Sequence, residues 1–429
     1  GDIVLKGGIA ASVANTPLLQ VYGSEYVFNA GGTEWNSIAF DPNNANKFVV
    51  VYADGGNSYY GTAIVGTISG TTISFGSETV FNTGNTQYPK ISFDPNTANK
   101  FVVSFHDTST TYGKAIVGTI SNTSISFGSA AVFNSAGTYK IRLSFDPNTA
   151  NKFVVVYKDD GNSRHGTAIV GTVSGTSISY GSEVVFAAAV TDTETISFDP
   201  NTSGKFVVVY TDGDNSNYGT SIVGTLSGTS TSYGSEVVFN SGNSSYSWSE
   251  FDPNTANKIV VSYRDGGNSG AGTAVVGTVS GTSISFGSSS VFNSGNTSYT
   301  SMSFDPNTSG SFIVSYKDNG NSDYGTACVG TVSGTSISFG SEGLFNAANT
   351  SYTSVSFDPN TANKYVIAYQ DAGNSNYGTA IVGNLSDALT IGSDYYVQSD
   401  GTVSTVTTSP AVKIGTAISA TTLNLMDQL

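Results

Sequence analysis

The feature that most constrains this chain is a unit that recurs seven times along it. The anchor of each unit is the tripeptide Phe-Asp-Pro, which begins at Phe40, Phe93, Phe145, Phe198, Phe251, Phe304 and Phe357. Successive anchors are 53 residues apart at every step but one, which is 52. A fixed period of this length indicates one supersecondary unit copied along the chain, in which each copy buries its apolar surface against its neighbours.

Each unit predicts four short strands. In the sixth unit, residues 299–304 alternate polar and apolar side chains, and residues 312–316 are apolar and β-branched, as in a strand covered on both faces. Residues 326–332 and 335–345 flank Ser333-Gly334, which is a hairpin signal. Turn-forming Asp, Pro, Asn and Gly separate the other strands, and no segment shows helical periodicity.

Seven copies of four antiparallel strands predict an all-β fold, a seven-bladed β-propeller, and leave a solenoid as the rival. Residues 21–28 match the fourth-strand pattern, although no other strand of their unit precedes them. We expect this N-terminal strand to complete the last blade and close the ring, which removes two unpaired edges. Residues 389–397 also resemble a fourth strand and are the alternative closing segment.

The repeats divide the chain into three parts. Residues 1–17 lie outside the repeat and form an N-terminal arm with one candidate strand at 2–5, and residues 18–386 form the propeller. The composition changes after residue 386. Residues 387–429 have alternating patterns around a Ser399-Asp400-Gly401 turn, which predicts a small C-terminal β module for anchoring or assembly, with the arm as a candidate partner.

The charge balance excludes several classes of partner. Charged residues make up only 11% of the chain, and its formal net charge is −15. Nucleic acid and anionic membrane surfaces both require clustered Lys and Arg, so we expect neither as a partner. No apolar run is long enough to predict membrane insertion. The single cysteine, Cys328, occupies a third-strand position that is Ile or Val in the other units, and we expect it to lie in the core.

The loops differ in variability between the two faces of the predicted ring. First-to-second and third-to-fourth loops share one face and are nearly identical between units, whereas second-to-third loops and blade connections share the other and vary more. A variable-loop face on a rigid scaffold is the expected binding surface. The loops of units two and three add the ligand-binding candidates Tyr112, Asp160, Arg164 and His165.

Aromatic residues recur where the first strands begin, at Trp35, Tyr88, Tyr139, Tyr246, Tyr299 and Tyr352. Such rings pack between blades or stack on sugar rings, and the sequence alone leaves both interpretations open. We include Trp35, Tyr88, Tyr246, Tyr299 and Tyr352 among the ligand-binding candidates.

An aspartate follows every second strand, at Asp54, Asp107, Asp159, Asp212, Asp265, Asp318 and Asp371. The Asp-x-Gly-Asn-Ser context resembles the Asp-box of sialidase-type propellers, and it predicts an Asx turn that caps backbone amides. Calcium binding is the alternative, best at Asp212 and Asp214, but the full twelve-residue calcium loop is missing. With two histidines, no nucleophile motif and no arginine cluster, the sequence predicts neither a catalytic site nor a cofactor.

Repeat and tail together resemble virion structural and tail-fibre proteins of marine bacteriophages, including cyanophages. The resemblance rests on Val-Phe-Asn-Ser-Gly-Asn-Thr-Ser-Tyr-Thr-Ser, on Gly-Thr-Ala-x-Val-Gly-Thr-Val-Ser-Gly-Thr-Ser-Ile-Ser-Phe-Gly, and on the C-terminal run from Tyr395 to Thr402. It implies a non-enzymatic tail-fibre, receptor-binding or capsid-decoration protein on the virion surface, outside the cell. Its partners would be other virion proteins, contacted through the termini and C-terminal module, and a host glycan or surface protein. The alternative is a secreted bacterial lectin or sialidase-like propeller.

Overall fold

The computed structural model describes residues 18–386 and five short strands near the termini. These five strands are β1 (Ile3–Val4), β30 (Asp394–Val397), β31 (Val403–Ser404), β32 (Val412–Ala417) and β33 (Leu423–Leu425). The chain separates into two compact units, Tyr22–Gly383 on the one hand and Gly1–Val21 with Asn384–Leu429 on the other. The described residues contain strands and single 3-10 turns, and among them no helix has the length and apolarity needed to cross a membrane.

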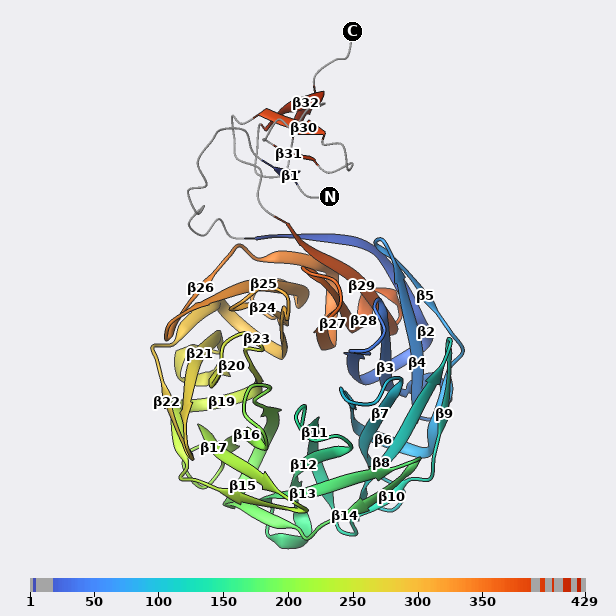
Figure 1. Ribbon diagram of the computed structural model, residues 1–429, viewed down its shortest axis with the longest axis vertical. Helices are drawn as coiled ribbons and strands as arrows, with labels where there is room; N and C mark the ends of the chain where they lie inside the picture. Colours follow the sequence, from blue (N-terminus) through green and yellow to red (C-terminus); the bar gives the residue numbers. More distant parts are fainter. Residues whose placement is uncertain are drawn as a thin grey trace. The chain divides into compact units, whose positions relative to one another are not determined.

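The larger unit is an all-β, propeller-like array of four-stranded antiparallel groups, which we call blades, placed side by side around a central axis (Figure 1). In the sixth repeat the strands are the second half of β23 (Ser290–Phe304), β24 (Ser311–Asp318), β25 (Tyr324–Ser333) and an outer strand made of β26 (Ser336–Phe339) and the start of β27 (Gly343–Phe357). As predicted, the second strand is covered on both faces, with Phe312, Ile313 and Val314 fully buried.

The other repeats reproduce these elements. The second strands are β3 (Lys47–Asp54), β7 (Lys100–Asp107), β12 (Lys152–Asp159), β16 (Lys205–Asp212), β20 (Lys258–Asp265) and β28 (Lys364–Asp371). The third strands are β4 (Tyr60–Ser69), β8 (Tyr112–Ser121), β13 (His165–Ser174), β17 (Tyr218–Ser227), β21 (Ala271–Ser280) and β29 (Tyr377–Ser386). The short outer strands are β5 (Thr72–Phe75), β9 (Ser124–Phe127), β14 (Ser177–Tyr180), β18 (Ser230–Tyr233) and β22 (Ser283–Phe286).

One continuous strand joins each blade to the next, where the sequence predicted a fourth strand, a connection and a separate first strand. The first half of β23 pairs with β21 of the preceding blade, and its second half pairs with β24 of its own blade. The same element recurs as β2 (Leu19–Phe40), β6 (Thr79–Phe93), β15 (Val184–Phe198), β19 (Val237–Phe251) and β27, and in interrupted form as β10 (Ala131–Asn134) with β11 (Thr138–Phe145). The predicted fourth strand is instead divided in two, because the chain turns away after Phe339 and rejoins the edge at Gly343.

The glycine that follows each short outer strand explains this division. A Cβ atom on Gly287 would lie 2.0 Å from the carbonyl oxygen of Thr335 in the next blade, and Gly76 stands in the same relation to Thr123, at 1.9 Å. Only a residue without a side chain allows so close an approach between backbones.

The two ends of the larger unit are in contact with each other. β2 pairs with β29 as well as with β3, and Val366 and Ala368 of the last repeat pack in one core cluster with Ile38 and Phe48 of the first. The Asp-Pro-Asn turns make the same connection. The asparagine side chain of each turn donates to the proline carbonyl of the next, through Asn43, Asn96, Asn148, Asn201, Asn254 and Asn307, and Asn360 of the last repeat donates to Pro42 of the first at 3.3 Å.

The smaller unit contains a five-stranded sheet in the order β1-β31-β30-β32-β33. β1 runs parallel to β31, with Ile3 opposite Val403, so the N-terminal arm and the C-terminal segment share one sheet. β30, within the alternative closing segment 389–397, pairs with β31 and β32. The predicted turn at Ser399–Gly401 lies outside the described residues.

Candidate functional site

Two cavities lie along the axis of the larger unit, and the repeat decides which residues line them. The first, which we call the axial pocket, measures about 120 Å³ and is lined mainly by residues that precede the Phe anchors by three to five positions. The second, the lower cavity, measures about 470 Å³ and is lined by the residues immediately before the anchors, by the anchor phenylalanines and by the prolines of the Asp-Pro-Asn turns. Trp248 lines both cavities.

An arc of five aromatic side chains forms one side of the axial pocket. Neighbouring ring centroids are 5.4 Å apart for Tyr246 and Tyr299, 5.0 Å for Tyr299 and Tyr352, 5.1 Å for Tyr352 and Trp35, and 4.4 Å for Trp35 and Tyr88, all in tilted arrangements. The sequence left open whether these rings pack between blades or stack on a ligand. In the structure they contact one another from blade to blade and also line a cavity.

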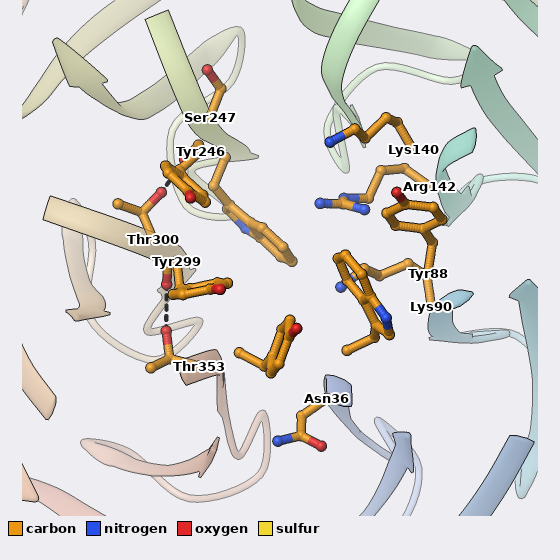
Figure 2. A pocket seen from close by; sticks show the side chains of 13 residues that line it. Asn36, Tyr88, Lys90, Lys140, Arg142, Tyr246, Ser247, Tyr299, Thr300 and Thr353 are labelled. Carbon is orange, nitrogen blue, oxygen red and sulfur yellow. Dashed lines mark hydrogen bonds between the residues drawn. The ribbon is translucent and has the colours of Figure 1, made fainter. Parts of the chain in front are cut away.

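A bulge in the long strand presents these rings. Tyr299 has a φ of 53°, and the pairing register of β23 with β24 shifts between Ser298 and Ser301. Trp35, Tyr88, Tyr246 and Tyr352 share the left-handed backbone, with φ between 51° and 59°. Such a conformation is uncommon for aromatic residues, and bulges re-aim side chains in this way. The Thr300 hydroxyl donates to the Tyr246 carbonyl, and Thr353 donates to Tyr299 in the same manner (Figure 2).

Three basic side chains lie on the side of the pocket where the arc ends at Tyr88. Figure 2 shows Lys90, Lys140 and Arg142 extending into the pocket from the side that faces Tyr246 and Tyr299. Lys90 Nζ and the Arg142 guanidinium carbon lie 5.9 and 5.8 Å from the centre of the Trp248 ring, and Lys140 Nζ lies 5.7 Å from that of Tyr88. These distances suit cation–π contacts.

Burial sets the electrostatics of the site. Burial and then the nearby positive charge of Arg142 hold the pKa of Lys90 well below its usual range. Lys140 is paired with Asp192, with 3.1 Å between Nζ and Oδ1. Burial also raises the pKa of Glu34, whose charge lies near Tyr352, and raises the pKa of Glu250 in the lower cavity to about 8. The pocket thus has its three basic side chains on the side of Tyr88, across from Tyr246 and Tyr299.

A wider groove adjoins the axial pocket and shares Lys140 and Tyr246 with it. The groove measures about 560 Å³ and is lined otherwise by Asp192, Asn243, Ser245, Arg264, Asn296, Ser298 and Asn319. Asn319 belongs to a second-to-third loop, so the groove opens on the face that carries the variable loops.

The structure brings together five of the nine predicted ligand-binding residues, namely Trp35, Tyr88, Tyr246, Tyr299 and Tyr352. Tyr112, Asp160, Arg164 and His165 do not line the axial pocket or the groove. Asp160 instead pairs with Arg164 at 3.4 Å, with 60% of the Arg164 side chain exposed.

The third repeat departs from the aromatic pattern that the sequence indicated. Lys140, not Tyr139, occupies the position with positive φ, at 54°. Tyr139 stacks on His106, with ring centroids 5.0 Å apart, and His106 Nδ1 is hydrogen-bonded to the Thr138 carbonyl. In this repeat Lys140 stands five residues before the anchor, at the position that holds the aromatic residue in five other repeats. Tyr139 stands one residue earlier, and each step along a strand reverses the side on which a side chain lies.

Sequence reasoning missed Trp248 and the three basic side chains, Lys90, Lys140 and Arg142, which we call the basic wall. The signal was the third position before each anchor, which holds Ser37, Thr195, Ser301 and Ser354 in four repeats but Lys90, Arg142 and Trp248 in the others. Aligning the repeats at this position would have singled out the three large residues.

The ring of aspartates after the second strands consists of Asx turns, as predicted. Each carboxylate accepts a hydrogen bond from the backbone amide two residues later, as Asp318 does from Gly320 at 3.0 Å. At the calcium candidate, Asp212 accepts from the amides of Asp214 and Asn215. Among residues that the structure describes, no three potential metal-ligating side chains cluster.

Comparison with known proteins finds similar folds among solved structures and no match among sequences. No family model matches the chain, and no curated protein matches its sequence. A solved protein of unknown function from Dyadobacter fermentans DSM 18053 is similar over 85% of this chain and 99% of its own, with a TM-score of 0.53 and 10% identity. Sqt1 from Chaetomium thermophilum, solved bound to the N-terminus of the ribosomal protein L10, is similar over 85% of this chain and 98% of its own, with a TM-score of 0.51 and 11% identity. At these identities the likeness concerns the fold alone.

Proposed function

We propose that this chain is a closed, seven-bladed β-propeller that binds carbohydrate in its axial pocket and acts without catalysis on the exterior of a bacteriophage particle. Closure is supported by the seven equivalent Asn-to-Pro hydrogen bonds, the last of which links Asn360 to Pro42, and by the pairing of β2 with β29. The virion setting is supported by the resemblance of repeat and tail to phage structural proteins.

The observation that carries the binding function is the aromatic arc. Five rings held by left-handed backbone and lining a cavity at the variable-loop face form a surface suited to stacking on the apolar faces of sugar rings. A purely structural packing role would not require the rings to border a cavity beside basic groups and a polar groove. The smaller unit, with its shared sheet of N- and C-terminal strands, is the part we assign to contacts with other virion proteins.

Binding to a glycan array tests the function, with Tyr246→Ala as the key variant. Tyr246 lies in the pocket, has 38% exposure and a φ of 52°. The control is Tyr59→Ala, because Tyr59 is 40% exposed with a φ of 59° but lies outside the pocket. We expect Tyr246→Ala to weaken glycan binding about tenfold and Tyr59→Ala to leave it unchanged. If no glycan binds the unmodified protein, the proposed function is wrong.

The virion setting requires its own test. Antibody labelling of purified particles, viewed by electron microscopy, should place the chain on the particle surface, and the isolated protein should compete with phage adsorption if it binds the receptor. Normal adsorption in the presence of saturating protein would leave capsid decoration as the role. Glycan binding by a protein that is absent from particles would instead favour the secreted lectin.

A further inference from the structure

We propose that the ligand is an acidic carbohydrate, whose terminal carboxylated or sulfated unit enters the axial pocket while the following units lie in the adjoining groove. This inference rests on the proposed function and specifies the class of ligand. It goes beyond the aromatic arc, because the arc alone would serve a neutral sugar equally well.

The first argument is the convergence of positive charge. The chain has only 16 Lys and Arg residues and a net charge of −15, yet Lys90, Lys140 and Arg142 meet in one cavity. Like charges at close range repel, and the repulsion is stronger where water is excluded. Burial is the larger cause of the lowered pKa of Lys90, and the positive charge of Arg142 lowers it further. A bound anion offsets the repulsion and gives the three cations a shared partner.

The second argument is the division of the pocket into two walls. An acidic sugar carries an anionic group on one side of a ring whose C–H face is apolar, and the pocket presents cations across from Tyr246 and Tyr299. Arg142 supplies planar, paired donors that suit carboxylate or sulfate oxygens, and a lysine ammonium adds a point charge. Asp192, which is paired with Lys140, lines the groove, whereas Lys90 and Arg142 line the axial pocket alone and are the anion contacts that we assign there.

The third argument is size. A cavity of about 120 Å³ is below the usual range for a whole ligand and suits a single terminal group. The adjoining groove of about 560 Å³ continues from it over Lys140 and Tyr246. Three asparagine amides line this groove, and Asn296 Oδ1 accepts from Arg264 Nε at 2.7 Å. Amides both donate and accept hydrogen bonds, which fits the hydroxyl groups of neutral sugar units.

The two tryptophans of the chain provide the readout, since Trp35 and Trp248 both line the axial pocket. Intrinsic fluorescence will therefore report occupancy without a label. The probes are oligogalacturonate and its methyl-esterified form, which share the sugar ring and differ in charge, together with sulfated and desulfated carrageenan oligosaccharides. The acidic member of at least one pair is expected to bind about tenfold or more tightly than its neutral counterpart.

Variants of the basic wall separate charge recognition from stacking. We expect Lys90→Met and Arg142→Gln each to weaken binding of the acidic probe about tenfold or more and to change binding of the neutral probe little. Lys140→Met serves as a second variant should Lys90→Met fold poorly, since 32% of the Lys140 side chain is exposed. The control is Lys364→Met, which removes the same charge at the start of β28, the end remote from the pocket.

Each result decides between the two proposals. Equal binding of acidic and neutral probes, lost in Tyr246→Ala, would overturn the acidic ligand and leave carbohydrate binding intact. Preference for acidic probes that survives in Lys90→Met, Lys140→Met and Arg142→Gln would place the anion elsewhere and also overturn it. Equal affinity for polyglutamate and acidic glycans would show that the pocket recognises negative charge alone, and would overturn the acidic carbohydrate as the ligand. Absence of any glycan binding would remove both proposals.

Discussion

At the scale of single residues, a tyrosine–glutamate pair recurs between the second strand and the outer edge of most blades. Tyr hydroxyl and Glu Oε1 are 2.6 to 2.8 Å apart in the pairs Tyr52–Glu78, Tyr157–Glu183, Tyr210–Glu236, Tyr316–Glu342 and Tyr369–Glu25. The second repeat lacks both partners, with Phe105 and Ala130 in their places. The fifth repeat keeps the buried tyrosine, Tyr263, and has Ser289 in place of the glutamate, with a side-chain hydrogen bond between the two. A buried hydroxyl thus keeps a polar partner in these repeats, and the repeat without the hydroxyl has none.

This pairing predicts a non-additive pair of substitutions. Glu342→Ala leaves the fully buried Tyr316 hydroxyl without its acceptor and should lower the free energy of unfolding by about 1–3 kcal/mol. Adding Tyr316→Phe should restore part of the loss, because the double variant reproduces the natural combination of the second repeat. Denaturant unfolding of the two single variants and the double variant measures the coupling. Simple additivity of the two losses would contradict this account.

Glu250 makes stability depend on pH. It stands in the lower cavity where five other repeats have serine, and burial raises its pKa from 4.5 to about 8. The folded protein therefore holds this proton more tightly than the unfolded chain does, so its contribution to stability is complete below about pH 4.5 and declines as the pH rises to 8.

We expect Glu250→Gln to remove this decline, since glutamine stays neutral and can still accept from the Phe304 amide. Thermal unfolding should show the variant matching the unmodified protein near pH 5 and exceeding it by several degrees near pH 9. Asp214→Asn, an equal charge change at an exposed side chain, controls for net charge. Parallel pH profiles of Glu250→Gln and the unmodified protein would argue against a raised pKa.

At the scale of strands, the sequence predicted the buried elements well and their outer connections less well. The apolar second strands, such as Phe312–Tyr316, follow directly from composition, and Ser333-Gly334 forms the expected turn, with a φ of 64° at Gly334. The continuous strand that joins blades was missed because its middle, such as Asn293–Asn296, is polar and turn-like. Its extended conformation depends on pairing with two different blades, which local propensity cannot express.

The candidate site, too, was predicted only in part from the sequence. Regular spacing identified the aromatic arc, whereas the basic wall appears only when strands from separate repeats meet around the axis. Lys90 and Arg142 are 52 positions apart in the sequence, and each looks like an ordinary exposed residue within its own strand. Tyr139 lies outside the pocket because it stands six residues before its anchor, whereas the rings of the arc stand five residues before theirs, and strand register turns that one step into a change of side.

At the scale of the whole molecule, the N-terminal strand behaves as a member of the last repeat. Glu25 binds Tyr369 across 344 positions, where every other such pair is 26 positions apart. Phe28, which is 5% exposed, would clash with a Cβ atom on Gly378, as Phe345 would with one on Gly325. The same contacts that hold an outer strand within one repeat thus connect the two ends of the larger unit.

A truncation tests whether these contacts close the molecule. A chain that begins at Thr33 keeps the part of β2 that pairs with β3 but loses Glu25, Phe28 and the pairing with β29. Removing a buried phenylalanine alone costs about 3–5 kcal/mol, so the midpoint of unfolding should fall sharply, and the exposed edge of β29 should promote self-association in gel filtration. A chain that begins at Leu19 retains the strand and is the control.

A synthetic peptide of residues 19–32, added to the truncated chain, should bind to it, because the vacated edge offers backbone partners and a pocket for Phe28. Binding should restore the midpoint of unfolding and reverse the self-association seen in gel filtration. An unchanged midpoint, or a peptide that does not bind, would show that the last repeat is complete without the N-terminal strand and that the ring is open.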